Sequence, residues 1–103
     1  MENEVLWLDD NRVVGLGELV EISGLTREEL IELVQGGAIP VREVHGTHYT
    51  FSARVISVAR TAGRLRDELE LDIAGLAVAL RLLDRVRGLE QEITHLRALL
   101  PRS

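Results

Sequence analysis

One stretch decides how the rest of the chain is arranged: residues 65–100, LRDELELDIAGLAVALRLLDRVRGLEQEITHLRALL. Apolar residues recur there in alternating steps of three and four, which on a helix places them along one narrow stripe. The pattern begins at Ala79 and continues through six larger residues, called the arm stripe below: Leu82, Val86, Leu89, Ile93, Leu96 and Leu100. A stripe of this kind packs against another helix, so the spacing predicts a long helix with a partner.

This long helix has clear ends. Asp72 is the predicted N-cap, because its carboxylate can accept hydrogen bonds from the open amides of the first turn, and Pro101 ends the helix. Leu76, Leu80 and Leu83 widen the stripe at the beginning, which predicts that the first half packs on a core and the second half projects as a coiled-coil-like arm. The arm stripe extends over about three heptads and favours a homodimer. The alternative is one long helix in a monomeric bundle.

Composition indicates one small domain with an aliphatic core. The chain has 103 residues, of which 46% are hydrophobic but only 3% aromatic, and it has no cysteine. Disulfides, thiolate metal sites and cysteine nucleophiles are therefore excluded. The first residues are acidic and no apolar run approaches the length of a membrane span, so we expect a cytoplasmic protein that does not contact a membrane.

Two short helices are predicted before residue 40. Apolar spacing from Leu16 favours a helix that ends near residues 23–24, and residues 26–29 (TREE) form a capping box that opens a second helix, which ends at residues 36–37. Two short helices with a glycine in the turn are typical of a helix-turn-helix. Upstream, residues 5–8 are either a strand or an extended segment that lays Trp7 on the core, and residues 9–12 read as a polar turn.

A hairpin and a third helix follow. Residues 41–44 and 48–51 are β-like segments around a glycine turn, of the size of a wing. Ser52 is the expected cap of the next helix, whose predicted inward residues are Val55, Val58, Ala62, Leu65 and Leu69. The predicted fold is therefore mainly α: a winged helix-turn-helix over residues 1–71 with a small β-hairpin wing, and a long C-terminal helix over residues 72–103.

No residue pattern indicates catalysis or a cofactor. His45 and His48 lie three apart in the predicted hairpin, and along one strand an odd spacing places two side chains on opposite faces, so they do not favour a metal site. His95 lies beside the arm stripe and is expected in solvent. Because the sequence contains neither a nucleophile motif nor a glycine-rich phosphate loop, we expect a protein that is not an enzyme and holds no metal.

Charge argues against nucleic acid as the partner. The formal net charge is −5, and the first 32 residues carry nine acidic side chains against two arginines. In helix-turn-helix proteins the second helix brings basic or amide side chains to the DNA groove, whereas here its exposed face is mainly glutamate. An acidic face repels phosphates and favours a basic protein partner. The alternative is that these glutamates are only a solvated helix face.

The sequence resembles two nested families. LVEISGLT at residues 19–26, GAIP at 37–40, the hairpin, and VARTAGRLRDEL at 58–69 resemble the MerR-type winged-helix module. RLRDELELDIAGLAVALRLLD at residues 64–84, then LEQE at 89–92 and LR at 96–97, closely resemble the chaperone-modulator family CbpM. The similarity covers about residues 16–100, and residues 65–84 are its most specific part.

The resemblance implies an antagonist of a DnaJ-like cochaperone, the curved-DNA-binding protein CbpA. Members of the family bind its J domain, stop it from stimulating the Hsp70 DnaK, and reduce its DNA binding. A J domain docks on Hsp70 through a basic helix, which an acidic face could cover. The candidate contacts are therefore Glu18, Glu21, Glu28, Glu29 and Glu32. A MerR-like DNA-binding regulator and a purely structural oligomerisation module remain as alternatives.

Overall fold

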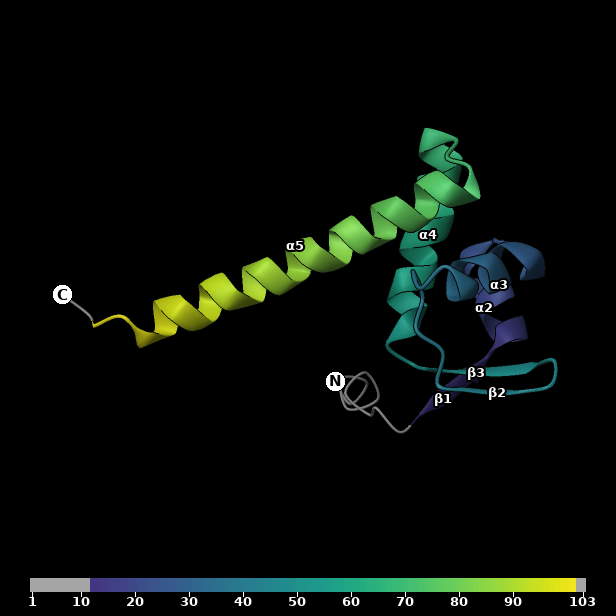
Figure 1. The fold of residues 1–103 in the computed structure, drawn as a ribbon, viewed down its shortest axis with the longest axis horizontal. Coiled ribbons are helices and arrows are strands. Elements are labelled where there is room, and N and C mark those ends of the chain that lie inside the picture. Colours follow the sequence, from purple (N-terminus) through teal and green to yellow (C-terminus); the bar gives the residue numbers. More distant parts are fainter. Residues whose placement is uncertain (1–11, 102–103) are drawn as a thin grey trace.

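The computed structural model describes residues 12–101, which form four helices and one small antiparallel sheet (Figure 1). The elements in chain order are β1 (Val13–Gly15), α2 (Leu16–Ser23), α3 (Arg27–Gln35), β2 (Glu43–His45), β3 (His48–Ser52), α4 (Val55–Leu69) and α5 (Ile73–Leu99). The mainly α winged helix-turn-helix fold is thus confirmed. The expectations for residues 5–8 and Trp7 lie outside the described residues.

The sheet contains one strand more than the predicted hairpin. Its order is β1-β3-β2, with Val14 opposite Phe51 and Val44 opposite Tyr49. β1 was not predicted because three residues are too short to show alternation, and the strand exists only through its pairing with β3. The wing hairpin is confirmed, although β2 begins at Glu43 rather than at residue 41.

Both predicted helices of the helix-turn-helix are present and end as expected. Thr26 Oγ1 accepts from the Glu29 amide at 3.0 Å and the Glu29 carboxylate accepts from the Thr26 amide at 2.9 Å, so the predicted capping box is confirmed. α2 ends at Gly24, whose φ of 79° is a left-handed conformation that glycine adopts without strain. Leu19, Leu30 and Leu33 are fully buried and join α2 and α3 to the core.

α4 buries the predicted stripe only in part: Val55 and Ala62 are buried as predicted, and Val58 and Leu65 pack half-buried against the core. The buried residues are Val55, Ala59, Ala62 and Gly63, whereas Leu69 is 61% exposed. The reason is close packing on α2, since a Cβ added to Gly63 would lie 1.9 Å from the Ser23 carbonyl oxygen. Small residues therefore face α2.

The predicted cap of α4 was also wrong. Arg54 occupies the N-cap position without a side-chain cap, and Ser52 is the last residue of β3. The Ser52 hydroxyl instead accepts a hydrogen bond from the Arg54 amide at 3.3 Å, before the first helical residue. Ser52 therefore stabilises the turn between β3 and α4 rather than the open amides of the helix.

α5 begins on the body and then leaves it. Asp72 is the N-cap, as predicted, and its carboxylate accepts from the Gly75 amide at 2.8 Å. Leu76 and Leu80 are buried against the body formed by the other elements, and the remainder projects as a long arm (Figure 1). Within residues 12–101, no helix is both long and apolar enough to cross a membrane.

Candidate functional site

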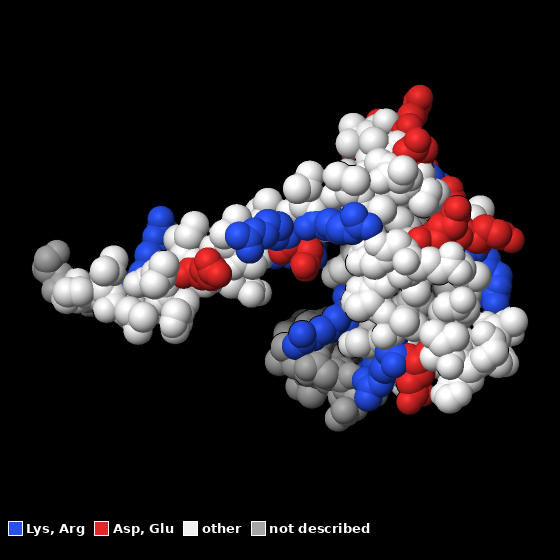
Figure 2. Space-filling view, in the orientation of Figure 1, with Lys and Arg blue, Asp and Glu red and all other residues white. Residues whose placement is uncertain are grey.

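Three of the five candidate glutamates are exposed and carry no structural contact. Glu28 and Glu32 lie one turn apart on α3, so they share one helix face, and Glu21 lies on α2. None of the three makes a side-chain hydrogen bond or ion pair to another described residue. Figure 2 shows acidic side chains gathered at the side of the body that carries α3, whereas basic side chains run along α5 next to the body.

The other two candidates hold helix ends. The Glu18 carboxylate accepts from the Gly15 amide at 2.8 Å at the start of α2, and Glu29 closes the capping box of α3. Each satisfies an amide that the helix itself leaves open. These two side chains are thus less available to a partner than Glu21, Glu28 and Glu32.

Glu29 is also joined to α4 by an arginine that sequence reasoning missed. The Arg66 guanidinium forms an ion pair with Glu29, donates to the Gly24 carbonyl oxygen at 3.2 Å, and donates to Asp67 at 3.0 Å. The hydrogen bond to Asp67, with the nearby charge of Glu29, raises the pKa of Arg66 above its ordinary value. Arg66 therefore fixes α4 against the α2–α3 turn, and no local pattern connects residues 37 positions apart.

The basic residue at the start of α3, Arg27, forms a hydrogen bond to the wing. Arg27 donates from Nη2 to the Thr47 carbonyl oxygen at 3.0 Å, which ties α3 to the turn of the hairpin. α2 and α3 together carry five glutamates and this single arginine. The surface that would approach a DNA groove is accordingly anionic, as the sequence indicated.

The two wing histidines are direct cross-strand partners, which corrects the geometry expected from sequence. His45 pairs with His48 across the two-residue turn, so both side chains leave the same face of the hairpin. An odd spacing separates the faces only along one strand, and the turn at residues 46–47 places the two histidines on different strands. The Glu43 Oε1 atom lies 3.5 Å from His45 Nε2. Even so, the described residues contain no group of three side chains that could hold a metal ion.

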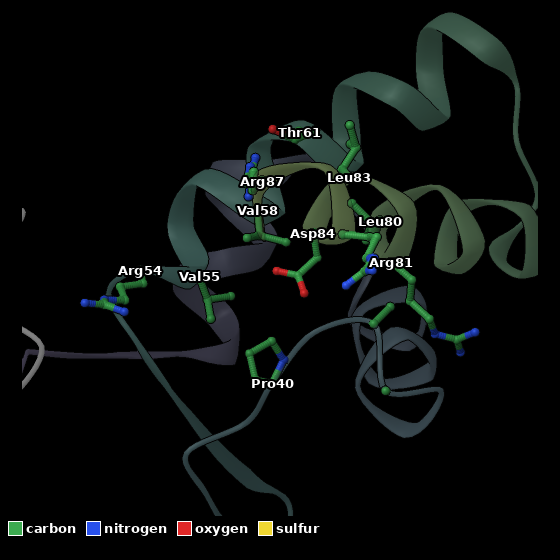
Figure 3. A pocket seen from close by; sticks show the side chains of 13 residues that line it. Pro40, Arg54, Val55, Val58, Thr61, Leu80, Arg81, Leu83, Asp84 and Arg87 are labelled. Atoms are coloured by element: carbon green, nitrogen blue, oxygen red, sulfur yellow. The ribbon is translucent and has the colours of Figure 1, made fainter. Parts of the chain in front are cut away.

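A groove of about 570 Å³ lies between the body and α5. In Figure 3 the side chains of Val55, Val58 and Leu80 line it above Pro40, and the Asp84 carboxylate points into it. Arg81 also lines the groove and donates to the Gly36 carbonyl oxygen, which holds α5 against the end of α3. The groove therefore comes from the angle at which α5 leaves the body.

The arm stripe is exposed along its whole length. Leu82 and Leu96 are each 60% exposed, and the least exposed member, Leu89, is still 40% exposed. Only Leu76 and Leu80 of α5 are buried, and every residue from 84 to 100 is exposed. A contiguous apolar stripe on a projecting helix is typical of an interaction surface.

Comparison with known proteins shows the family to which the chain belongs. The family described as MerR HTH family regulatory protein matches residues 14–98, from β1 to the end of the arm. The chain is 42% identical over 80 residues to the chaperone modulatory protein CbpM of Escherichia coli (strain K12 / DH10B) and to that of Shigella boydii serotype 18, covering 78% of this chain and 79% of each relative. The family and both relatives are described as regulatory or modulatory proteins. The chain belongs to the MerR-type helix-turn-helix regulatory proteins and, among them, to the CbpM chaperone modulatory proteins.

Proposed function

We propose that this protein binds the J domain of a DnaJ-like cochaperone of the CbpA type, and that binding inhibits both the stimulation of the Hsp70 DnaK and the cochaperone's DNA binding. The observation that carries the proposal is the acidic helix-turn-helix within a member of the CbpM family. A basic helix of the J domain would lie against α2 and α3, where it could no longer reach Hsp70.

The five candidate glutamates differ in how accessible their side chains are to a partner. Glu21, Glu28 and Glu32 are exposed and have no side-chain hydrogen bond or ion pair among residues 12–101, so they can meet a basic helix without losing such bonds. Glu18 and Glu29 each have one carboxylate oxygen engaged by a backbone amide, and they would contribute mainly through their charge. The expected interface is thus centred on the exposed face of α3, with α2 beside it.

A MerR-like DNA-binding function is the second candidate because the winged helix-turn-helix is itself a DNA-binding architecture. Basic residues outside α3 could contact phosphates, for example the exposed Arg42 near the wing. The acidic face opposes this function, since each glutamate near the groove would repel the phosphate backbone. Direct binding of nucleic acid is therefore not expected.

We also infer that the protein is a homodimer that pairs through the arm stripe. The six residues would otherwise leave a row of apolar side chains in water, and pairing two arms buries both rows at once. Dimerisation would place two acidic faces on one particle.

Calorimetry tests the J-domain proposal. We would titrate the full-length protein with the isolated J domain of the DnaJ-like cochaperone from the same organism, at low and at moderate salt. We expect saturable binding that weakens as salt rises, because rim charges mainly govern association and are screened. A second titration uses Glu28→Lys with Glu32→Lys. Replacing two attractive pairs by repulsive ones should weaken Kd by about tenfold or more.

The matched control is Glu90→Lys with Glu92→Lys, which makes the same charge change on exposed arm residues. Light scattering in the same samples reports whether the control alters association of the arms. Equal loss of affinity in both double variants would reduce the effect to net charge, and loss only in the arm variant would move the interface to α5. Absence of binding at either salt would contradict the proposal and make a DNA-binding screen the next step.

A further inference from the structure

A second groove lies on the body between α2 and α4, away from the acidic face of α3. Its volume is about 760 Å³, within the range of pockets that hold ligands. Ile22 of α2 and Ala53 and Ile56 at the start of α4 supply apolar surface. Its polar lining is basic or neutral: Arg12, Arg54, Ser57 and Arg60. Such a groove fits an apolar peptide that carries negative charge.

The chain enters this groove at a fixed point. The Arg12 carbonyl oxygen accepts a hydrogen bond from the Ala53 amide at 3.1 Å, and both residues line the groove. β1 begins at the next residue and is held in register by Val13 opposite Ser52. Whatever precedes Arg12 therefore starts at the groove wall.

The preceding segment has the matching chemistry. Residues 1–11 read MENEVLWLDDN, with a central apolar run of four residues between two pairs of acids and without a basic residue. A chain extends at most about 3.6 Å per residue, so residues 5–10 can reach no farther than roughly 25 Å from Arg12. The length of the segment therefore allows its apolar side chains and carboxylates to reach the apolar walls and guanidinium groups of the groove.

We propose that residues 1–11 dock in this groove of their own chain, with the apolar run 5–8 against Ile22 and Ile56 and the acids beside Arg12 and Arg60. The groove is then an intramolecular peptide site, and the segment covers a basic patch of the body. Attachment at Arg12 raises the effective concentration of the segment, so modest contacts suffice. This inference does not depend on the identity of the cochaperone.

Trp7 reports on docking directly, because it is the only tryptophan in the chain. We would measure its emission maximum and its quenching by acrylamide, a neutral quencher that charge substitutions do not bias, in the full-length protein. Docking should give a blue-shifted emission and a lower quenching constant than a free peptide of residues 1–11. Both values should be independent of protein concentration, since a segment exchanged between two copies would be released on dilution.

Arg60→Glu is the test variant and Arg64→Glu is its matched control, because Arg64 is exposed on α4 one turn further on and does not line the groove. Arg60→Glu replaces attraction between the arginine and the acids of the segment by repulsion, which should lower the ratio of docked to free segment roughly tenfold. Asp9→Arg with Asp10→Arg should have the same effect. Combining Arg60→Glu with the two segment substitutions should restore protection. Far-UV circular dichroism confirms that each variant is folded.

Several results would overturn the proposal. A wild-type Trp7 that is quenched as readily as the free peptide would mean that the segment does not dock. Protection unchanged by Arg60→Glu, or lost equally in Arg64→Glu, would place Trp7 elsewhere on the protein. Protection that disappears on dilution would assign the contact to a second copy, and failure of the combined variant would remove the charge pairing on which the argument rests.

Discussion

Pairing of the arms makes a quantitative prediction for Ile93→Glu with Leu96→Glu. These residues are 48% and 60% exposed in the single chain, so about half of each side chain remains to be buried by a partner. Full burial of such a side chain contributes about 1.5–3 kcal/mol, and half of it about 1 kcal/mol. A dimer loses four of these contributions, roughly 4 kcal/mol, before any cost of burying carboxylates is added.

A loss of that size weakens the dimerisation constant by about a thousandfold, since each 1.4 kcal/mol is a factor of ten. Sedimentation equilibrium or light scattering over a range of protein concentrations measures the constant. We expect a wild-type dimer and a variant that stays monomeric at the same concentrations. Because the arm lies outside the body, the variant should unfold at nearly the same temperature once both proteins are compared as monomers.

The control adds the same charges to the other side of the arm. Gln91 and Ala98 are exposed and lie on the face opposite the arm stripe, so Gln91→Glu with Ala98→Glu should leave the dimer intact. Equal dissociation in both variants would mean that added negative charge, rather than lost apolar contact, separates the chains. A wild-type protein that is monomeric at the highest concentration would refute the reasoning, because the exposed stripe would then need another partner.

Two further predictions concern the packing of the body. Gly63→Ala should destabilise the fold by about 1–3 kcal/mol, because the added Cβ would meet the Ser23 carbonyl oxygen. Gly17→Ala has open space around it and should stabilise α2 by up to about 1 kcal/mol. Urea unfolding measures the free energy of unfolding of both variants, which should change in opposite directions. Thr26→Ala should lower the free energy of unfolding by about 1 kcal/mol through loss of the cap on the Glu29 amide, and should lower Tm by about 4–8 °C; an unchanged Tm would contradict the capping account.

Local signals in the sequence predicted the elements that depend on neighbours in the chain. Thr26 and Asp72 cap α3 and α5 as their residue types indicate, and the glycine after α2 adopts its left-handed turn. Features that depend on distant residues were missed. β1 requires β3 to exist, and the buried side of α4 is set by the approach of Ser23 to Gly63. The capping box in the sequence already gives Glu29 a structural role, but the ion pair of Glu29 with Arg66 depends on a residue that is distant in the chain.

The wing shows the same limit at a smaller scale. His45 and His48 are three apart in the chain, and whether that spacing separates or unites two side chains depends on where the strand turns. The two-residue turn at residues 46–47, with Gly46 at a φ of 62°, makes them partners. The position of the turn, which the spacing alone does not reveal, therefore determines the face of the hairpin from which each histidine side chain leaves.

The glutamates of α3 differ in how much the fold needs them, and this difference yields a prediction about the proposed interface. Glu29 caps the helix and binds Arg66, and Glu28 in the first turn is favoured by the helix dipole. Glu32 has neither role, and its charge repels that of Glu28 one turn away, which costs an isolated helix a few tenths of a kcal/mol. A small local cost without compensation among the described residues is expected where a surface serves binding. Glu32 should therefore affect binding more than it affects the stability of the fold.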